Sequence, residues 1–285
     1  MKNLLKAFLY KISKDITLRI TLIIGAGLAV FMTALFAFIQ YGLLSFDDME
    51  ETGETIKFIS GQGMFLTSIS PAQNYGLAIP INLVSFICLE FSQGTIRNKI
   101  IAGHSKFKIY ASLFISGLIF CFVLLGTYVL ICTGLGAIFG GFNFDDVVFG
   151  LMGAAKITPE YFIKMIIIAI VTYICIVSFT VFMATTLRSI GPCIPVIIVP
   201  IVILYLAGTM SSVFAMTPED FDYQPFLNVL RVIDPLYAVS TIETTESGLA
   251  QMENLTFIGA ICSNLIYATL FFIGGSLLFK NRDVK

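Results

Sequence analysis

The chain has 285 residues, of which 57% are hydrophobic and only 12% are charged, and its formal net charge is −1. About a quarter of the residues in soluble domains are charged, because the surfaces of these domains face water. This composition therefore excludes an ordinary soluble protein and indicates a membrane protein. The cysteines fall within or at the ends of apolar runs, without the spacing of a disulfide framework or a metal site. No phosphate-binding loop, GxSxG elbow or HExxH helix occurs, so we expect no catalytic residue, metal or bound cofactor.

Residues 1–16 place apolar side chains at helical spacing with lysines around them. This pattern is typical of a helix that lies in the inner membrane interface, with its lysines near anionic headgroups. A basic flank that only sets the topology is an equally open interpretation. No small-residue cleavage site follows the first apolar run, so that run is expected to stay in the protein as a span.

Six apolar runs are long enough to cross a hydrocarbon core of ~30 Å. They cover residues 18–44, 70–91, 109–135, 162–187, 192–213 and 257–279. The sequence therefore predicts an all-α polytopic membrane protein, with one domain over residues 1–285 and six transmembrane helices.

The charged residues are sorted between the loops. Most of the 17 Lys and Arg residues lie before residue 20, in the loop 92–108 and after residue 279, whereas most of the 18 Asp and Glu residues lie in other loops. Because Lys and Arg stay on the cytoplasmic side of short loops, the loop 92–108 and both termini are expected to be cytoplasmic. Segments 45–69, 136–161 and 214–256 are expected outside.

Segment 214–256 differs from the other outer segments because it holds an apolar cluster around Phe226 and Leu230. A water-exposed loop would not keep such a surface. We therefore expect this segment to re-enter the membrane edge or to pack over the spans, either as a gate or as a cap. A small separate outer domain is the alternative.

Asn82 and Ser85 are polar residues at membrane depth in the second apolar run. They either form hydrogen bonds between helices or line a substrate pathway together with Phe226 and Leu230. No Asp, Glu, Lys, Arg or His lies at the centre of a span. This absence argues against a proton- or sodium-coupled carrier, in which such residues mark the ion path.

A short basic segment follows the second run and has helix signals at both ends. Thr95 can cap the N-terminus of a helix, and Gly103 can take the left-handed position after its end. Glu90 lies at the lip of the span, where it is expected either to pair with a cation of the inner side or to snorkel. The sequence does not identify its partner.

Three isoleucines of this segment, Ile96, Ile100 and Ile101, are expected to share one exposed face. A helix this short is marginal alone because nucleation is costly, so the face is expected to fit the cleft of a partner. Basic residues that only anchor the loop in the membrane interface are the alternative interpretation, which we prefer for Lys106 and Lys108.

The stretch Glu90-Phe91-Ser92-Gln93-Gly94-Thr95-Ile96-Arg97-Asn98-Lys99 and its continuation to Lys106 resemble the membrane-spanning subunits of ABC-2 type transporters. That family also has six spans and both termini inside. The resemblance implies that the segment is a coupling helix, which docks onto a separate ATP-binding subunit, and that the inner turn at Arg188 makes a lesser contact. The implied coupling residues are Glu90, Thr95, Ile96, Arg97, Asn98, Lys99, Ile100, Ile101, Gly103, His104 and Arg188.

The resemblance further implies a permease subunit of an ATP-driven exporter in a bacterial cell membrane. Two ATP-binding subunits would bind ATP and Mg²⁺, and a second permease subunit would complete a homodimer or a related heterodimer. Membrane lipid is an expected partner and nucleic acid is not. The charge-poor, Phe-rich interior favours an amphipathic peptide as cargo, as in the similar exporters of phenol-soluble modulins and lantibiotics. The alternatives are a hydrophobic-drug or lantibiotic-immunity exporter, and a membrane scaffold without transport.

Overall fold

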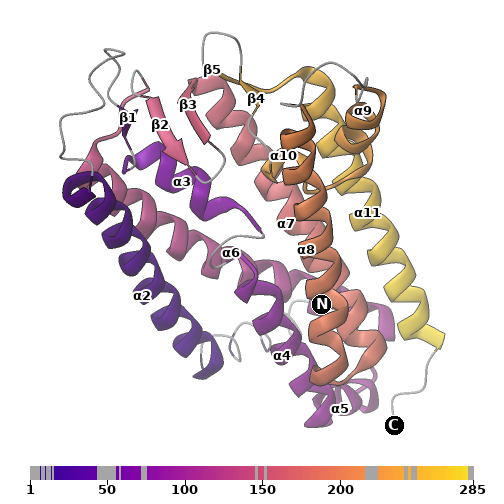
Figure 1. The fold of residues 1–285 in the computed structure, drawn as a ribbon. Helices are drawn as coiled ribbons and strands as arrows, with labels where there is room; N and C mark the ends of the chain where they lie inside the picture. The colour runs from indigo at the N-terminus through magenta and orange to yellow at the C-terminus, as the bar shows by residue number, and fades with distance from the viewer. Residues whose placement is uncertain are drawn as a thin grey trace.

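The computed structural model is a helical bundle with one small sheet at one end (Figure 1). Apart from three separate residues before Ile16, the described parts of the chain are 16–43, 56–57, 59–71, 76–144, 147–150, 153–215, 224–240, 243–244 and 249–281. The interfacial helix expected over 1–16 therefore lies almost wholly outside the described residues. The expectation of a mostly helical polytopic membrane protein is confirmed.

Five helices are long and apolar enough to cross a membrane. They are α2 (Ile16–Phe38, continued by the π-helical turn η1, Ile39–Leu43), α6 (Lys106–Gly140), α7 (Pro159–Leu187), α8 (Ile190–Ala215) and α11 (Asn254–Asn281). Each of them covers most of one predicted apolar run.

The second predicted run, 70–91, is not one continuous span. The chain forms the short helix α3 (Gly61–Ile69), breaks at Ser70, and resumes as α4 (Ala78–Ser92). Ser70 has an extended backbone, which is the conformation that a residue before proline prefers, and Pro71 follows it. A sixth span is obtained only when α4 is counted together with the helix after it, α5 (Thr95–Ile101), from which it is bent by 55°.

A small five-stranded mixed sheet, which the sequence did not predict, adds to this predominantly helical fold. Its strands, in the spatial order β1-β2-β3-β5-β4, are β1 (Ile56–Lys57), β2 (Val147–Gly150), β3 (Gly153–Ile157), β5 (Leu249–Gln251) and β4 (Glu243–Thr244). Pairing is parallel in β1–β2 and β3–β5 and antiparallel in β2–β3 and β4–β5. The sheet joins strands from all three segments expected outside, so these segments lie at the same end of the bundle.

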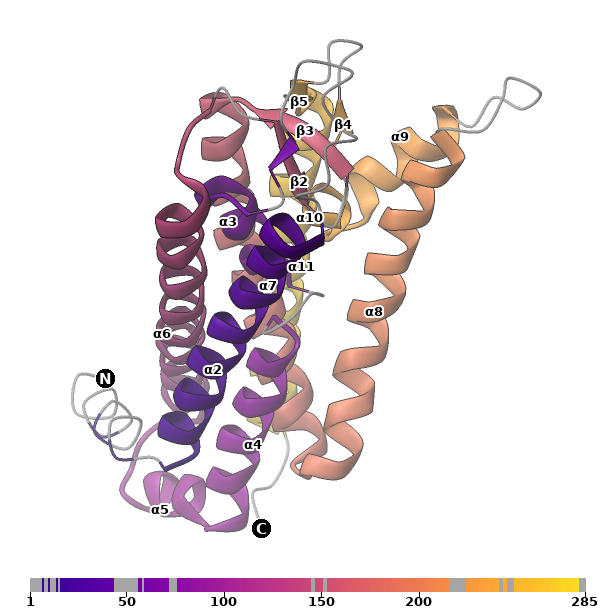
Figure 2. The ribbon, with the colours of Figure 1, turned by 60° about the vertical axis from the view of Figure 1, so that its left-hand side comes forward.

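The helix α5 lies at the opposite end of the bundle from the sheet (Figures 1 and 2). The first turn of α2 and the last turn of α11 lie at the α5 end as well. The arrangement therefore separates the basic loop 92–108 from the three acidic segments, as the charge pattern predicts for two different membrane faces.

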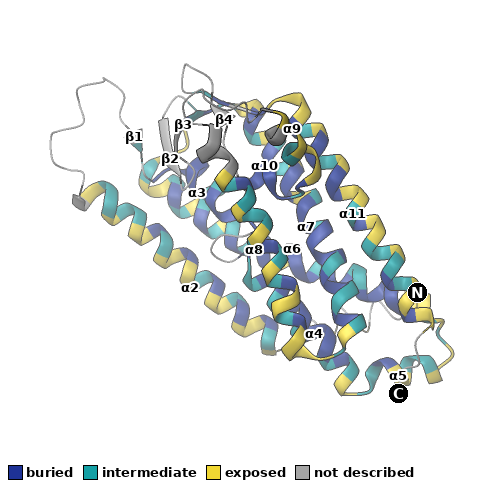
Figure 3. Ribbon diagram, turned by 45° about the vertical axis from the view of Figure 1, so that its right-hand side comes forward, coloured by how far each residue is buried: buried dark blue, intermediate teal, exposed yellow. Residues whose placement is uncertain are grey.

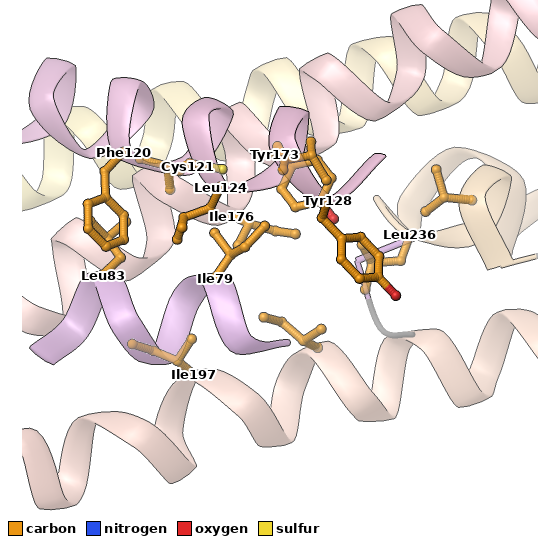
Figure 4. Close-up of a cluster of buried hydrophobic side chains, with 14 of the residues drawn as sticks. Ile79, Leu83, Phe120, Cys121, Leu124, Tyr128, Tyr173, Ile176, Ile197 and Leu236 are labelled. Carbon is orange, nitrogen blue, oxygen red and sulfur yellow. The ribbon is translucent and has the colours of Figure 1, made fainter. Parts of the chain in front are cut away.

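The core centres on α7, which packs along α11 and also contacts α4, α6 and α8. Its side chains are largely buried, whereas α2 and α8 expose large apolar residues on their outer faces (Figure 3). Figure 4 shows part of this core, where residues of several helices meet. The side chains labelled there are Ile79, Leu83, Phe120, Cys121, Leu124, Tyr128, Tyr173, Ile176, Ile197 and Leu236.

Close packing of α3 against α6 fixes the sheet end of the bundle. A Cβ added at Gly140 would fall on the backbone carbonyl of Ile59, and one added at Gly136 would lie 2.8 Å from the Ser60 carbonyl oxygen. The amide of Gly61 also donates to the carbonyl oxygen of Gly141 over 2.9 Å. Only glycine allows the backbones to approach this closely.

Candidate functional site

The corner between α4 and α5 is built around Gly94. Its φ of 67° is in the left-handed region, which glycine adopts without the steric penalty of a Cβ. Gly94 is the N-cap residue of α5, and its carbonyl oxygen accepts from the amide of Asn98 over 3.0 Å. The expectation that Thr95 is the cap is therefore wrong, since Thr95 is the first residue of the helix.

The carboxylate of Glu90 fastens α5 to α4. Glu90 is only 1% exposed, and its Oε2 lies 2.7 Å from Lys99 Nζ and 2.7 Å from Thr95 Oγ1. Thr95 Oγ1 also lies 2.8 Å from the Glu90 carbonyl oxygen, so its hydroxyl can donate to either acceptor. A buried carboxylate needs such donors to offset its desolvation. Lys99 is thus the cation that the sequence leaves unidentified, and we call the Glu90–Thr95–Lys99 set the latch.

The C-terminal end of α5 is closed by a Schellman motif at Gly103. The amide of Gly103 donates to the Ile100 carbonyl oxygen over 3.0 Å, and that of His104 donates to the Lys99 carbonyl oxygen over 3.2 Å. Gly103 has φ 84°, so the prediction of a left-handed residue here is confirmed. Both ends of this seven-residue helix are therefore fixed by glycines.

The three isoleucines do not form one exposed face. Ile96 is fully buried, Ile100 is half-buried against the core, and only Ile101 is exposed, at 73%. The apolar side of α5 faces its own bundle because buried apolar side chains of α4 and α6 lie there to receive it. This corrects the expectation that all three would serve a partner.

The surface that α5 turns away from the bundle consists of Arg97, Asn98 and Ile101, all exposed. We call these three residues the outer face of α5. It combines one cation, one amide and one large apolar side chain. Such a combination is suited to binding another protein, and it holds no nucleophile or general base.

Arg188 lies beside α4 and not on the outer face of α5. It ends α7 in the left-handed conformation, with φ 57°. Its guanidinium carbon lies 5.6 Å from the ring centroid of Phe91, and that ring meets Phe279 of α11 edge-on at 6.2 Å. Arg188 therefore contributes to the packing of α4, α7 and α11 at this end.

Asn82 and Ser85 both have hydrogen-bond partners in the helices. Asn82 Oδ1 accepts from Thr21 Oγ1 over 2.8 Å, which joins α4 to α2, and its Nδ2 donates to the Ala78 carbonyl oxygen over 2.7 Å. Ser85 Oγ donates to the Ile81 carbonyl oxygen over 3.1 Å. These contacts support the interpretation that Asn82 and Ser85 form hydrogen bonds within and between helices.

The apolar cluster of segment 214–256 forms α9 (Gln224–Ile233), which packs over the start of α11. A Cβ at Gly259 of α11 would lie 2.9 Å from the Arg231 carbonyl oxygen, so the two backbones approach closely. Arg231 is paired with Glu253 over 2.9 Å. Leu230 is half-buried on this helix, and the side chain of Phe226 is outside the described residues.

Asp234 is buried at the corner after α9, before the short helix α10 (Tyr237–Ser240). Its Oδ1 accepts from the amide of Leu236 over 2.8 Å. Burial raises the pKa of this carboxyl to about 6, although backbone hydrogen bonds from Leu236 and Tyr237 lower it in part. In the sequence, only the Asp-Pro pair after the apolar cluster marks the position of this buried carboxyl.

The model of the DUF2705 family, described as a protein of unknown function, matches residues 28–285. The chain belongs to this family. No curated protein matches it. The match begins within α2 and includes the latch, the outer face of α5 and the sheet.

Within the described part of this DUF2705 protein, no group of three or more His, Cys, Asp or Glu residues is arranged to hold a metal ion. The described cysteines are buried except Cys262, and all are free thiols. The short helix α5 combines a buried attachment through the latch with the exposed residues Arg97, Asn98 and Ile101.

Proposed function

We propose that this chain is the membrane-spanning subunit of an ATP-driven exporter of the ABC-2 type in a bacterial cell membrane. The observation that carries the proposal is the construction of α5, a short helix fastened to a span by the buried Glu90 carboxylate while Ile101 remains 73% exposed. The resemblance of residues 90–106 to the coupling segment of ABC-2 permeases supports the same conclusion. In this proposal the α5 end is cytoplasmic and the sheet is outside.

Coupling in this proposal is mechanical. A separate ATP-binding subunit docks on Arg97, Asn98 and Ile101, and its ATP-driven closure pushes α5. The latch transmits that displacement to α4, because Glu90 and Lys99 hold the two helices together across their 55° bend. Only a subunit that contacts α5 differently in its two states can shift the bundle between two conformations. ATP and Mg²⁺ belong to the partner, and this chain contributes no catalytic residue.

The cargo that we propose is an amphipathic peptide. The spans carry no charge at their centres, so a charged or strongly hydrated cargo would lose its hydration without compensation. The amphipathic helix α9, with Val229, Val232 and Ile233 exposed, supplies an apolar surface at the proposed exit. A hydrophobic drug or a lantibiotic in an immunity exporter is the second candidate, favoured by the same surface.

A second permease subunit, identical or related, completes the proposed pathway. The outer faces of α2 and α8 expose large apolar side chains, among them Ile23, Phe31 and Ile203. In a bilayer such faces meet either lipid or another subunit. A membrane scaffold without transport is the competing function, and it differs in requiring no ATP-binding partner.

The proposal is tested by purifying the tagged chain from native membranes and identifying its partners by mass spectrometry. We expect an ATP-binding subunit with the wild type. Ile101→Asp should remove it, because burying an isoleucine is worth about 1.5–3 kcal/mol and a buried carboxylate would add a desolvation cost.

Ser105→Asp is the matched control. It adds the same charge to the same loop, four residues beyond Ile101, and aspartate replaces serine well as the N-cap of α6. We expect this variant to keep the partner. Purification without any ATP-binding subunit from wild-type membranes would favour the scaffold.

A further inference from the structure

We propose that the corner between α9 and α10 is a pH-sensitive closure of the bundle, which ionisation of Asp234 loosens and protonation tightens. This corner lies at the same end of the bundle as the sheet (Figures 1 and 2). It forms part of the wall of an apolar cavity of about 280 Å³ between α7, α8 and α11, so loosening it opens the apolar interior at this end. No residue of α5 or of the latch takes part, and the docking of an ATP-binding subunit is not required.

Asp234 holds the corner together through three hydrogen bonds. Its amide donates to the Leu230 carbonyl oxygen over 2.9 Å at the end of α9, and its carbonyl oxygen accepts from the Tyr237 amide over 3.3 Å at the start of α10. Its Oδ1 accepts from the Leu236 amide over 2.8 Å, which closes the turn around Pro235. A change in the charge of this one side chain therefore acts on the junction of two helices.

The two sides of the corner are attached to the bundle to different extents. On the α10 side, residues 236–239 are buried, and Asn264 Nδ2 of α11 donates to the Pro235 carbonyl oxygen over 2.8 Å. On the α9 side, Val232 and Ile233 are exposed. Opening of the corner is thus a local fluctuation of a mostly closed structure, and its frequency depends on the free energy of the closed form.

The closed corner accommodates the neutral form of Asp234 better than the charged form. The residue is 2% exposed, its Oδ2 has no hydrogen-bond partner among the described residues, and none of their cations pairs with it. A buried carboxylate without a cation or sufficient donors is disfavoured. Burial accordingly raises the pKa of this carboxyl from 3.8 to about 6. Above this pH, an open corner that returns the carboxylate to water becomes more populated.

The charged groups on the elements packed around this corner pair with one another. Arg231 of α9 pairs with Glu253, which precedes α11, over 2.9 Å, and Lys164 of α7 pairs with Glu160 over 2.7 Å. The helix α8 has no charged residue, and the one charged residue of α11, Lys280, lies in its last turn, at the opposite end of the bundle. None of these pairs supplies a countercharge to the Asp234 carboxylate.

The direction of the pH dependence distinguishes Asp234 from its neighbours. Protonation of Glu253 would break its ion pair with Arg231 and loosen α9 in acid, whereas protonation of Asp234 tightens the corner. Phenols and thiols ionise mainly above the pH range used below. On these elements they include Cys175, Tyr205, Tyr237 and Tyr267.

The test is amide hydrogen exchange of the full-length chain in lipid nanodiscs between about pH 4 and about pH 7.5, followed by mass spectrometry. The peptide to follow contains the Leu236 and Tyr237 amides, and its rates are corrected for the intrinsic pH dependence of exchange. We expect opening to be about 50-fold more frequent at the higher pH, the change that a pKa of about 6 in the closed form and 3.8 in the open form produces. Peptides of α7 should show no such change.

Asp234→Asn keeps an acceptor for the Leu236 amide and cannot ionise. Its corrected exchange should be independent of pH and as slow as that of the wild type at about pH 4. Glu253→Gln is the matched control, which removes a neighbouring carboxylate and should keep the increase. A wild-type corner whose corrected exchange does not rise with pH would overturn the proposal whatever the variants do, and so would a rise that persists in Asp234→Asn.

Discussion

Replacing Lys99 by methionine should destabilise the cytoplasmic end that we propose, because it removes the cation of the latch and leaves the Glu90 carboxylate buried. Removing one partner of a buried ion pair costs about 3–5 kcal/mol. Two features reduce that cost here. The Lys99 side chain is 18% exposed, so water can reach part of the site, and Thr95 Oγ1 still lies 2.7 Å from the carboxylate. We therefore expect a loss of about 2–3 kcal/mol.

The assay is thermal unfolding in detergent, followed with a thiol-reactive fluorophore. The buried Cys88 and Cys193 become reactive when this end opens, while the exposed Cys262 gives a constant background. A loss of 2–3 kcal/mol corresponds to a decrease in Tm of about 4–12 °C in a chain of this size. The control is Arg97→Met on the same helix, which removes an exposed cation and should change stability by less than about 0.5 kcal/mol.

A double-mutant cycle measures the interaction energy between Glu90 and Lys99 separately from their contacts with other residues. Glu90→Gln removes the buried charge and keeps an acceptor for Thr95, so in the Glu90→Gln background Lys99→Met should cost much less than in the wild type. If Lys99→Met is as mild as Arg97→Met in the wild-type chain, the latch does not hold α5 and the reasoning is wrong.

Three further predictions follow from single residues. Burial raises the pKa of the Asp234 carboxyl from 3.8 to about 6, so the folded chain binds this proton more tightly than the unfolded chain. The free energy of unfolding, measured at a series of pH values, should therefore decrease from about pH 4 to about pH 6. The variant Asp234→Asn should not show that decrease. Gly140→Ala places a Cβ on the Ile59 carbonyl and should lower Tm, whereas Gly134→Ala in the same helix meets nothing within 4 Å and should not. Gly94→Ala should cost about 1–2 kcal/mol in the same assay through its left-handed backbone alone, since no atom opposes the new Cβ.

The lengths of apolar runs were sufficient to predict five spanning helices, because a helix that crosses a membrane requires a run that no soluble segment needs. They were insufficient for the second run. Its first residues, 70–76, are mostly polar or helix-breaking, and the helix in this run, α4, begins only at Ala78 and has 15 residues. The sheet was missed for another reason: its strands have two to five residues, too short for a period-two pattern to emerge.

The prediction for α5 shows what an amphipathic pattern leaves open. The spacing of Ile96 and Ile100 correctly indicates one apolar face, but it does not state whether that face meets a partner or the protein itself. Here the bundle receives it, and Ile101 alone stays exposed. The pairing of Glu90 with Lys99 was equally inaccessible, because they are nine positions apart in the sequence and the 55° bend between α4 and α5 brings the two side chains together.

Docking of an ATP-binding subunit on α5 is tested most directly by a photo-cross-link from this helix in native membranes. A photoreactive amino acid is placed at Ile101, and as a control at Ile138, which is 76% exposed near the opposite end of α6. We expect position 101 to cross-link to an ATP-binding subunit and position 138 not to do so. Absence of any ATP-binding subunit from the products at position 101, in membranes where the chain is intact, would contradict the proposal that α5 is a docking helix.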